Sequence, residues 1–362
     1  MNVNRILQIR NRDALKTFQD FLLAWWRRVE VDAMLAPVEL PDHTGASPQL
    51  ITHPDELSKV NPFVPVMLNN SASMVEDFVR DHPMSHLAVI LRPCELRALV
   101  ELKKRNRVHY YPISSNKQGE CLVIIGVDCP GTFSLTEYTR HVARQQDDAQ
   151  IIQVELAYGR QNSYIPYQVR AACQMCDSPG PIGADIVLGM IGIEPQGSLL
   201  FIARDEETDA RLRLREVTDN IATERQVVCR EVMVGKLADQ RAQKRDELIK
   251  AQAWQVEDMD MAWALFARCT LCADCLDACP LYDGELSGML GVCEAGQNLN
   301  PLLSELVSVS RWLASCSGCG MCQESCERGV SLTPIVTTLS HRIQNQLHYK
   351  PGDPAQRLPW LV

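Results

Sequence analysis

Cysteine is absent from the first 93 residues of this 362-residue chain, although the whole chain contains 15. Basic residues are also scarce relative to acidic ones. The 36 Lys and Arg residues stand against 45 Asp and Glu, so the formal net charge is −9. A general nucleic-acid-binding protein presents a basic surface to phosphate, and this charge balance excludes that class.

Long apolar runs are missing as well. The longest runs, such as Phe21–Trp26 and Leu122–Val127, fall far short of the roughly 20 residues that span a bilayer. The first ten residues hold no apolar core of signal-peptide length. We therefore expect a soluble, cytoplasmic protein.

Several common catalytic fingerprints do not occur. The chain has no G-x-S-x-G elbow, no Walker loop and no H-E-x-x-H pair. Its glycines in the relevant region do not have G-x-G-x-x-G spacing, so a Rossmann dinucleotide site is not supported; these glycines are Gly183, Gly189, Gly192 and Gly197. The chemistry must be sought elsewhere.

The cysteines that are present gather in short runs. Fifteen in 362 residues is well below the roughly 8–10% typical of a disulfide scaffold. Nine of them lie between Cys269 and Cys326, many with two residues between neighbours. An odd total with such gaps in a long chain indicates metal ligation rather than disulfides.

Two of these runs form an internal repeat. The first has the spacing C-x2-C-x2-C-x3-C followed by Pro280, and the second repeats that spacing 47 residues later. Three thiolates two residues apart can bind three irons of one cubane, while the fourth points to the neighbouring cluster. We therefore predict two [4Fe–4S] clusters, one on Cys269, Cys272, Cys275 and Cys326, the other on Cys316, Cys319, Cys322 and Cys279.

Zinc is the alternative, because C-x2-C pairs also form structural zinc sites. Zinc gains nothing from a swapped fourth ligand, so we favour iron–sulfur. Glu327 stands where a proline is usual after the fourth cysteine, which removes no ligand. With 36 residues between the runs, the region resembles the helical two-cluster module of the C-type subunit of heterodisulfide reductase and of succinate dehydrogenase iron–sulfur subunits.

Four further cysteines suggest a third site. Cys94 and Cys129 each follow a predicted strand, and Cys173 and Cys176 form a C-x2-C pair. Because the carboxyl ends of parallel strands meet at one edge of a sheet, these four thiols can converge. Inert core cysteines are an equal alternative on spacing alone. Cys121, Cys229 and Cys293 are left as structural residues.

Three segments resemble the beta-subunit family of coenzyme F420 hydrogenases and formate dehydrogenases. They are Leu91–Leu99, Gly126–Thr132, and Cys173–Cys176 with the later Ala184–Gly192, and the resemblance covers about residues 60–200. It implies an FAD-binding α/β domain with one [4Fe–4S] cluster on the four cysteines of the third site. Where deazaflavin-using members carry a Gly-Gly segment, this chain has Asn61–Ser71.

The flavin contacts that we expect from this resemblance lie in backbone-rich loops that can present amide donors. They are Asn69, Asn70, Arg92, Pro93, Asp128, Gly131, Thr132, Gly189 and Gly192.

Hydrophobic periodicity gives a coarse outline of the elements. It predicts helices over residues 13–28, 95–105, 207–223, 230–255, 302–314 and 333–346, and strands over 87–91, 121–127, 151–156, 164–169, 186–188 and 199–203. The six prolines between residues 36 and 66 predict an extended loop. The strand–helix–strand order at 87–127 predicts a parallel βαβ unit.

The predicted architecture is an N-terminal α/β flavin-binding domain followed by an all-α dicluster ferredoxin-like domain. The expected divisions are a helix and extended segment at 1–60, the α/β domain at 61–204, a helical linker at 205–256, the two-cluster domain at 257–347 and an irregular tail at 348–362.

The function that fits these features is an electron-transfer subunit with FAD and three [4Fe–4S] clusters. The resemblance implies a hydrogenase or formate dehydrogenase catalytic subunit as partner, or heterodisulfide reductase-type subunits. The flavin would face a deazaflavin, a nicotinamide, a quinone or a ferredoxin. The alternatives are a flavin-free iron–sulfur wire and an electron-input subunit of a sulfite reductase or sulfhydrogenase complex.

Overall fold

The fold is described from a computed structural model. It describes residues 2–29, 31–41, 45–82, 86–109, 111–112, 121–142, 169–193, 197–257, 260, 264–282 and 301–361. None of the described helices combines the length and the apolar composition that a membrane span requires.

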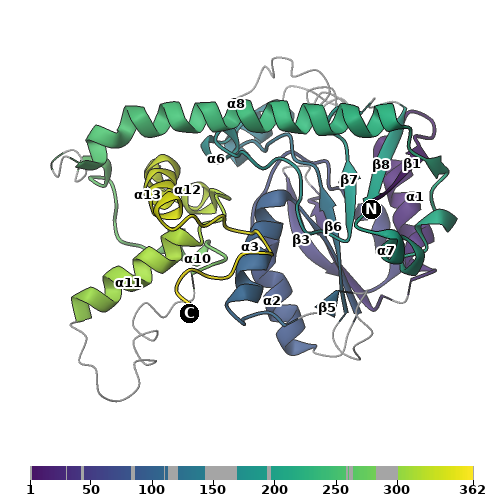
Figure 1. The fold of residues 1–362 in the computed structure, drawn as a ribbon, viewed down its shortest axis with the longest axis horizontal. Helices are drawn as coiled ribbons and strands as arrows, with labels where there is room; N and C mark the ends of the chain where they lie inside the picture. The colour runs from purple at the N-terminus through teal and green to yellow at the C-terminus, as the bar shows by residue number, and fades with distance from the viewer. Residues whose placement is uncertain are drawn as a thin grey trace.

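A nine-stranded mixed sheet forms the centre of the larger part of the molecule (Figure 1). Its order is β3-β2-β4-β6-β7-β8-β1-β9, with β5 beside β6. The strands are β1 Val3–Gln8, β2 Ala33–Glu39, β3 Ala46–Ile51, β4 His86–Leu91, β5 Tyr111–Pro112, β6 Cys121–Val127, β7 Ile186–Gly189, β8 Ser198–Ala203 and β9 Asn220–Ile221. Strands β2, β4, β6 and β7 run parallel, as does β5 beside β6, and the other pairs are antiparallel. The predicted α/β class and parallel βαβ unit are confirmed.

Helices cover both faces of this sheet. Helix α1 (Ala14–Trp26) packs on one face, where Phe18 and Trp25 are fully buried and Phe21 lies 4.3 Å from Phe201 of β8 between ring centroids. Helices α2 (Ser71–Asp81) and α3 (Pro93–Lys104) pack on the other face. Side chains alternate along the central strands, so β2, β4 and β6 each supply both cores.

Helix α1 begins where the sequence predicts. Asp13 caps it by accepting a hydrogen bond of 2.8 Å from the backbone N–H of Lys16, which satisfies a first-turn donor. The apolar residues that predict the helix are the ones it buries. This prediction is confirmed.

The extended loop predicted for residues 36–66 is wrong. Strands β2 and β3 lie there, followed by the short 3-10 helix η1 (Pro54–Lys59), and Pro37 faces Pro48 across the antiparallel pair. Strand β4 pairs only with Ala33–Leu35 of β2, so the missing N–H of Pro37 lies beyond that ladder. Pro48 lies in the edge strand β3, which is the position that tolerates proline.

The helix predicted over 207–223 is also wrong. A short helix α7 (Glu206–Arg211) and the 3-10 turn η2 (Leu214–Glu216) occupy that region, and β9 then pairs with β1. Strand β1 was not predicted from its sequence. It places the first residues of the chain inside the sheet, between β8 and β9. The strands predicted at 151–156 and 164–169 lie outside the described residues, apart from Val169, which is irregular.

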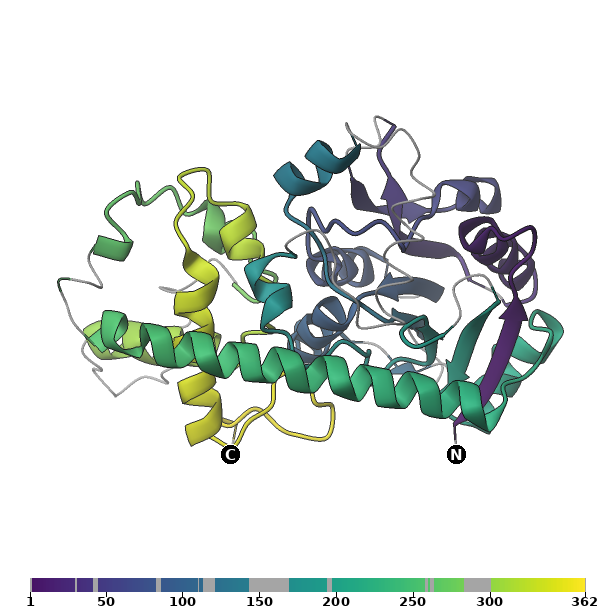
Figure 2. The ribbon, with the colours of Figure 1, turned by 90° about the horizontal axis from the view of Figure 1, so that it is seen from above.

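A single long helix joins the two parts of the molecule. Helix α8 (Glu224–Glu257) has 34 residues, so it is roughly 50 Å long at 1.5 Å per residue. Figure 2 shows it running along the α/β part and past the C-terminal helices. The helix predicted over 230–255 is confirmed, with an earlier start.

The C-terminal part is helical, as predicted. Its helices α11 (Pro301–Ala314) and α13 (Leu332–Gln346) match the predicted ones closely. The remaining described helices are short: α4 Leu135–Val142 and α6 Ala171–Gln174 in the α/β part, and α10 Asp274–Asp277 and α12 Met321–Glu324 here.

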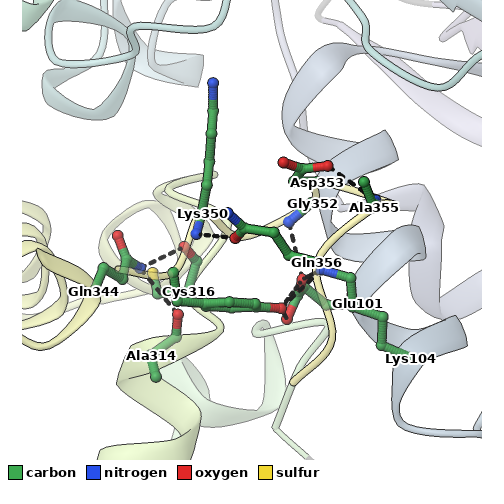
Figure 3. A network of polar contacts seen from close by, with 11 residues as sticks. Glu101, Lys104, Ala314, Cys316, Gln344, Lys350, Gly352, Asp353, Ala355 and Gln356 are labelled. Atoms are coloured by element: carbon green, nitrogen blue, oxygen red, sulfur yellow. Dashed lines mark hydrogen bonds and ion pairs between the residues drawn. The ribbon is translucent and has the colours of Figure 1, made fainter. Parts of the chain in front are cut away.

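The chain after α13 is irregular, as predicted, and it packs back on α3. The side chain of Glu101 in α3 is fully buried and accepts hydrogen bonds from Tyr349 Oη at 2.6 Å, from Gly352 N at 2.9 Å and from Lys104 Nζ at 2.9 Å (Figure 3). Gln344 in α13 donates to three carbonyls around Cys316. The tail therefore fastens the C-terminal part to the α/β part.

Candidate metal centres

The two C-terminal cysteine runs share one backbone conformation. Leu271 and Ala273 have φ of 58° and 70°, and Gly318 and Gly320, 47 residues later, have φ of 68° and 72°. A four-residue helix follows the second of these residues in each run, α10 and α12 respectively. The sequence repeat is therefore also a structural repeat.

The first predicted set of four thiols lies together. Burial raises the pKa of Cys275, and the neighbouring thiols of Cys326, Cys269 and Cys272 raise it further. Cys269 and Cys272 are exposed. The fourth member of this set, Cys326, thus comes from the second run.

The second predicted set is more buried and takes its fourth member from the first run. Burial raises the pKa of Cys322, as do Cys319, Cys316 and Cys279 in that order. Cys279 also accepts a hydrogen bond of 3.3 Å from the indole N–H of Trp312 in α11. The structure therefore places Cys279 of the first run near the thiols of the second run.

Buried donors without partners surround the second set. Asn70 Nδ2, Ser315 Oγ and Ser340 Oγ are buried and have no hydrogen-bond partner in the described chain. Burial raises the pKa of Cys319, and the nearby Asn70 side chain acts in the opposite direction. Burial likewise raises the pKa of Cys316, and the Ser340 side chain acts to lower it. These donors suit an acceptor-rich group held between the thiols, as cluster sulfurs are. The donor set and its surroundings fit an iron–sulfur cluster.

The third predicted set lies at the carboxyl edge of the parallel strands. Cys94 follows β4 at the start of α3, and Cys129 follows β6. Burial raises the pKa of Cys94 well above its usual value, and Cys129 is among the groups that raise it further. Burial likewise raises the pKa of Cys129 to about 12, with Cys173 as the next cause and Cys176 as a further one. All four thiols of this set are neighbours.

Thr132 and Arg170 hold the thiol of Cys173. The thiol accepts a hydrogen bond from Thr132 N at 3.3 Å and lies 3.4 Å from Thr132 Oγ1, while Arg170 Nη2 is 3.9 Å away. Burial acts to raise the pKa of Cys173, but the guanidinium and the hydrogen bonds outweigh it and the pKa is lowered. The thiolate form is stabilised at this position, as metal ligation requires.

The three sets lie in a row. Cys94 of the third set and Cys319 of the second pack in one apolar cluster with Met67 and Met321. Cys322 of the second set lies near Cys275 of the first. The order is therefore the first set, with two exposed cysteines, then the second set and the third set, in each of which one cysteine is buried and three are half-buried. Among the described residues, no group of three or more His, Cys, Asp or Glu side chains is arranged to hold a single metal ion.

Arg97 in α3 connects the third set to the second. Its guanidinium donates to the carbonyl of Ser317 at 2.8 and 3.1 Å and to the carbonyl of Ser178 at 3.3 Å, and it lies 3.6 Å from Cys176 Sγ. Ser317 lies between the second-set ligands Cys316 and Cys319. No motif in the sequence signals this bridge.

The residues predicted to contact flavin have other contacts here. Asp128 binds Arg230 of α8 through Nε at 2.9 Å and accepts from Met190 N at 3.0 Å. A Cβ on Gly189 would meet Arg230 at 2.8 Å, and a Cβ on Gly192 would meet the carbonyl of Cys229 at 2.7 Å. Asp128, Gly189 and Gly192 thus dock α8 on the sheet edge.

The other predicted flavin contacts lie nearer to the thiols. Asn70 caps α2 and lies toward Cys319, Thr132 contacts Cys173, and Gly131, with φ of 122°, lies between Val169 and Arg241. Arg92 donates to the carbonyl of Val64 at 2.6 Å, Pro93 begins α3, and Asn69 is an exposed loop residue. Their role toward a flavin stays a prediction.

A cavity of about 390 Å³ opens between the second and third sets. It touches Cys176 and Cys316, and its charged lining is mainly basic, with Arg97, Arg245 and Lys350 against Asp177. His341 also lines it, but burial lowers the pKa of this imidazole and favours its neutral form. Asp177 is ion-paired with Arg245. Sequence patterns could not reveal this site, because its lining comes from five separate stretches of the chain.

The three cysteines left without a role stay outside these sets. Cys229 is exposed on α8. Cys121 begins β6, and its side chain lies outside the described residues, as does all of Cys293.

Comparison with known proteins gives three findings. Residues 84–227 match the family described as the C terminus of the coenzyme F420 hydrogenase/dehydrogenase beta subunit, and this range contains all the motifs that carry the resemblance. Two relatives are an F420-dependent formate dehydrogenase subunit beta of Methanocaldococcus jannaschii, 23% identical, and an F420-dependent formate dehydrogenase 1 subunit beta of Methanococcus maripaludis, 21% identical. Each alignment covers 89% of this chain and 87% or 86% of the relative. A chain of the F420-reducing [NiFe] hydrogenase complex from Methanosarcina barkeri matches with a TM-score of 0.48 and 13% identity, over 72% of this chain and 94% of that chain.

Proposed function

We propose that this chain, whose residues 84–227 belong to the coenzyme F420 hydrogenase/dehydrogenase beta-subunit family, is an electron-transfer subunit of a multi-subunit oxidoreductase. The observation that carries the proposal is the row of three four-thiol sets, which runs from an exposed end to the carboxyl edge of the sheet. Relatives named as formate dehydrogenase beta subunits align along most of the chain.

Each set is proposed to hold one [4Fe–4S] cluster, which carries single electrons when bound. The protein supplies the thiolates, buries the second and third sets, and directs neutral donors such as Trp312 and Asn70 at the sulfurs. Such hydrogen bonds tune the potential of a cluster and fix its ligands. The packing of Cys94 with Cys319 brings two of the sites close across the contact between the two parts of the molecule.

The proposed partner is a catalytic subunit of the hydrogenase or formate dehydrogenase type, or a heterodisulfide reductase-type subunit. The exposed first set is the end at which a partner can exchange electrons with this chain. Native purification through a tag on this chain tests the proposal. We expect such a subunit to co-purify with a brown protein that contains about 12 iron atoms per chain. A colourless protein without iron would rule out an electron-transfer role.

We also propose that the chain binds FAD in the cavity between the second and third sets, which is lined by none of the residues predicted to contact flavin. Arg97, Arg245 and Lys350 in the lining suit the diphosphate of the cofactor, and a cavity of about 390 Å³ can hold part of it. A flavin there would lie beside Cys176 and Cys316, so it could exchange electrons with either site.

Acid extraction of the purified protein tests the flavin directly. We expect FAD to be released from the wild type and from Lys236→Ala, in which an exposed lysine of α8 is lost. Lys350→Ala removes an exposed lysine at the cavity and should lower the FAD content severalfold. A wild type that releases no flavin while retaining its iron would support the flavin-free wire instead.

A further inference from the structure

Guanidinium groups are concentrated around the third cysteine set. Arg92, Arg170 and Arg241 are each more than nine-tenths buried, and Arg97 is half-buried. They reach the site from three different regions of the chain. Burying four cations beside one site is costly unless negative charge compensates them.

The contacts aim this positive charge at the thiols. Arg170 lies between Thr132 Oγ1, at 2.8 Å from its Nε, and the thiol of Cys173, at 3.9 Å from its Nη2. Arg97 approaches Cys176 to 3.6 Å. Arg241 of α8 donates to the carbonyl of Pro130, next to Cys129.

The nearby carboxylates have partners of their own. Glu95 accepts from Ser71 Oγ at 2.6 Å and from the backbone N–H of Arg92 at 2.8 Å, at the positive end of α3. Asp177 pairs with Arg245. Glu324 faces Arg170 from α12 and is half-exposed. These acids reduce the positive field at the third set, but the charges of Arg92 and Arg241 still act on Cys129, where they oppose the rise in its pKa.

The other two sets have different surroundings. The second set has neutral donors from Trp312, Asn70 and Ser340. It also feels the charge of Arg170 at Cys319 and of Arg97 at Cys316, but neither Arg92 nor Arg241 is among the groups that act on its thiols. Two cysteines of the first set are exposed to water, and charged residues of both signs lie near its cysteines in the sequence, including Asp274, Asp277 and Glu327 as well as Arg268 and Arg328. Positive charge is therefore graded along the row and is highest at the third set.

We propose that Arg170, together with Arg97 and Arg241, raises the reduction potential of the third cluster above the potentials of the other two. This inference rests on the clusters of the proposed function. Reduction adds one electron and no proton to the cluster, so its negative charge grows by one, and a fixed buried cation stabilises the reduced form. The donor is the cluster of the second set. The third cluster, beside the cavity, is therefore the one that holds the electron. Arg170 acts on it through its positive charge.

A redox titration followed by electron paramagnetic resonance tests this. The step of the third cluster is the one that disappears from the Cys173→Ala/Cys176→Ala protein. In Arg170→Gln we expect the equilibrium constant for reduction of the third cluster to fall at least tenfold. Its reduction potential would then be lower by about 59 mV, the value for one electron. Arg170→Lys keeps the charge and should restore at least half of the shift. The steps of the first and second clusters should move less.

Two further variants complete the test. Arg241→Gln should shift the same step in the same direction, so the inference stays testable if Arg170→Gln does not assemble its third cluster. Arg5→Gln is the matched control, because Arg5 is equally buried but pairs with Asp209 at the far edge of the sheet.

Unchanged potentials in Arg170→Gln and Arg241→Gln, with about 12 iron atoms retained, would overturn the inference and leave the proposed function standing. Equal shifts of all three steps, also seen in Arg5→Gln, would overturn it as well. A wild type with about eight iron atoms would instead remove the third cluster, and the inference with it.

Discussion

At the scale of single residues, two glycines in the second cysteine run have the same backbone conformation but different surroundings. Gly318 and Gly320 have φ of 68° and 72°. A Cβ added to Gly318 meets nothing within 4 Å, whereas a Cβ on Gly320 would lie 2.4 Å from the Cβ of Ala172 in α6. Gly320 therefore lets the C-terminal part approach the helix that carries Cys173.

We predict that Gly320→Ala is much more damaging than Gly318→Ala. Both substitutions cost about 1 kcal/mol for the left-handed backbone. Gly320→Ala adds about 2 kcal/mol for the overlap with Ala172 and moves the second set away from the third. Anaerobic thermal unfolding and iron analysis measure this. Equal melting temperatures and iron contents in the two variants would show that the close approach is absent.

The spacing of the cysteines made it possible to predict from the sequence which thiols belong to one set. Three cysteines at three-residue steps along one run can face the same cluster. The residues that surround the thiols were not predictable in this way. Asn70, Ser340 and Arg170 are far from their cysteines in the sequence or have no motif of their own, and only the packing of the two parts brings them together. The cysteine repeat could be recognised by its spacing, whereas the arginines had no such signal.

At the scale of elements, helix α8 depends on two small residues of the sheet edge, Gly189 and Gly192. Gly192 has φ of 77°, and a Cβ there would lie 2.7 Å from the backbone carbonyl of Cys229. The ion pair between Asp128 and Arg230 fixes the same contact. At this contact, helix α8 is therefore held by the close approach of its backbone to Gly192 and by the ion pair.

We predict opposite effects for two glycine substitutions along this contact. Gly192→Ala should destabilise the protein by about 3 kcal/mol, from the strained φ and the overlap with a backbone atom that has little room to move. Gly235→Ala lies in the interior of α8 with nothing within 4 Å of the new Cβ, and it should stabilise by up to about 1 kcal/mol. Denaturant unfolding measures both. A neutral Gly192→Ala would contradict the docking described here.

Helices with clear periodicity and strands with continuous apolar runs were predictable: the strands predicted at 87–91, 121–127, 186–188 and 199–203 are β4, β6, β7 and β8, whereas β2 and β3 were not predicted. Helices α1 and α13 bury the residues that give their sequences a helical period. Strands β2 and β3 contain prolines that argue against a sheet, and they exist because the ladder avoids Pro37 and ends at an edge beside Pro48. Local sequence does not contain that information.

At the scale of the whole molecule, Glu101 joins the tail to the α/β part. The carboxylate is fully buried, and it accepts hydrogen bonds from Tyr349 and Gly352 and forms an ion pair with Lys104. Burial raises the pKa of the Tyr349 hydroxyl, and the hydrogen bond to Glu101 and the charge of that carboxylate raise it further. The tyrosine therefore stays a donor at neutral pH.

We predict that Tyr349→Phe destabilises the protein by about 2 kcal/mol, the value of a hydrogen bond to a charged group. The folded-state pKa of Tyr349 is raised, so this contribution is complete below the ordinary tyrosine pKa of about 10 and is lost as the pH rises above it. The difference in unfolding free energy between wild type and Tyr349→Phe should shrink as the pH is raised from about 9 to about 11. A difference that grows with pH over that range would contradict the assignment.

Iron analysis of the Cys173→Ala/Cys176→Ala protein decides whether three clusters lie in one row through this chain. We expect about 12 iron atoms per chain in the anaerobically purified wild type and about four fewer in the variant. The first two clusters should keep their spectroscopic signals, because their ligands lie in the C-terminal runs. Unchanged iron content in the variant would contradict the account.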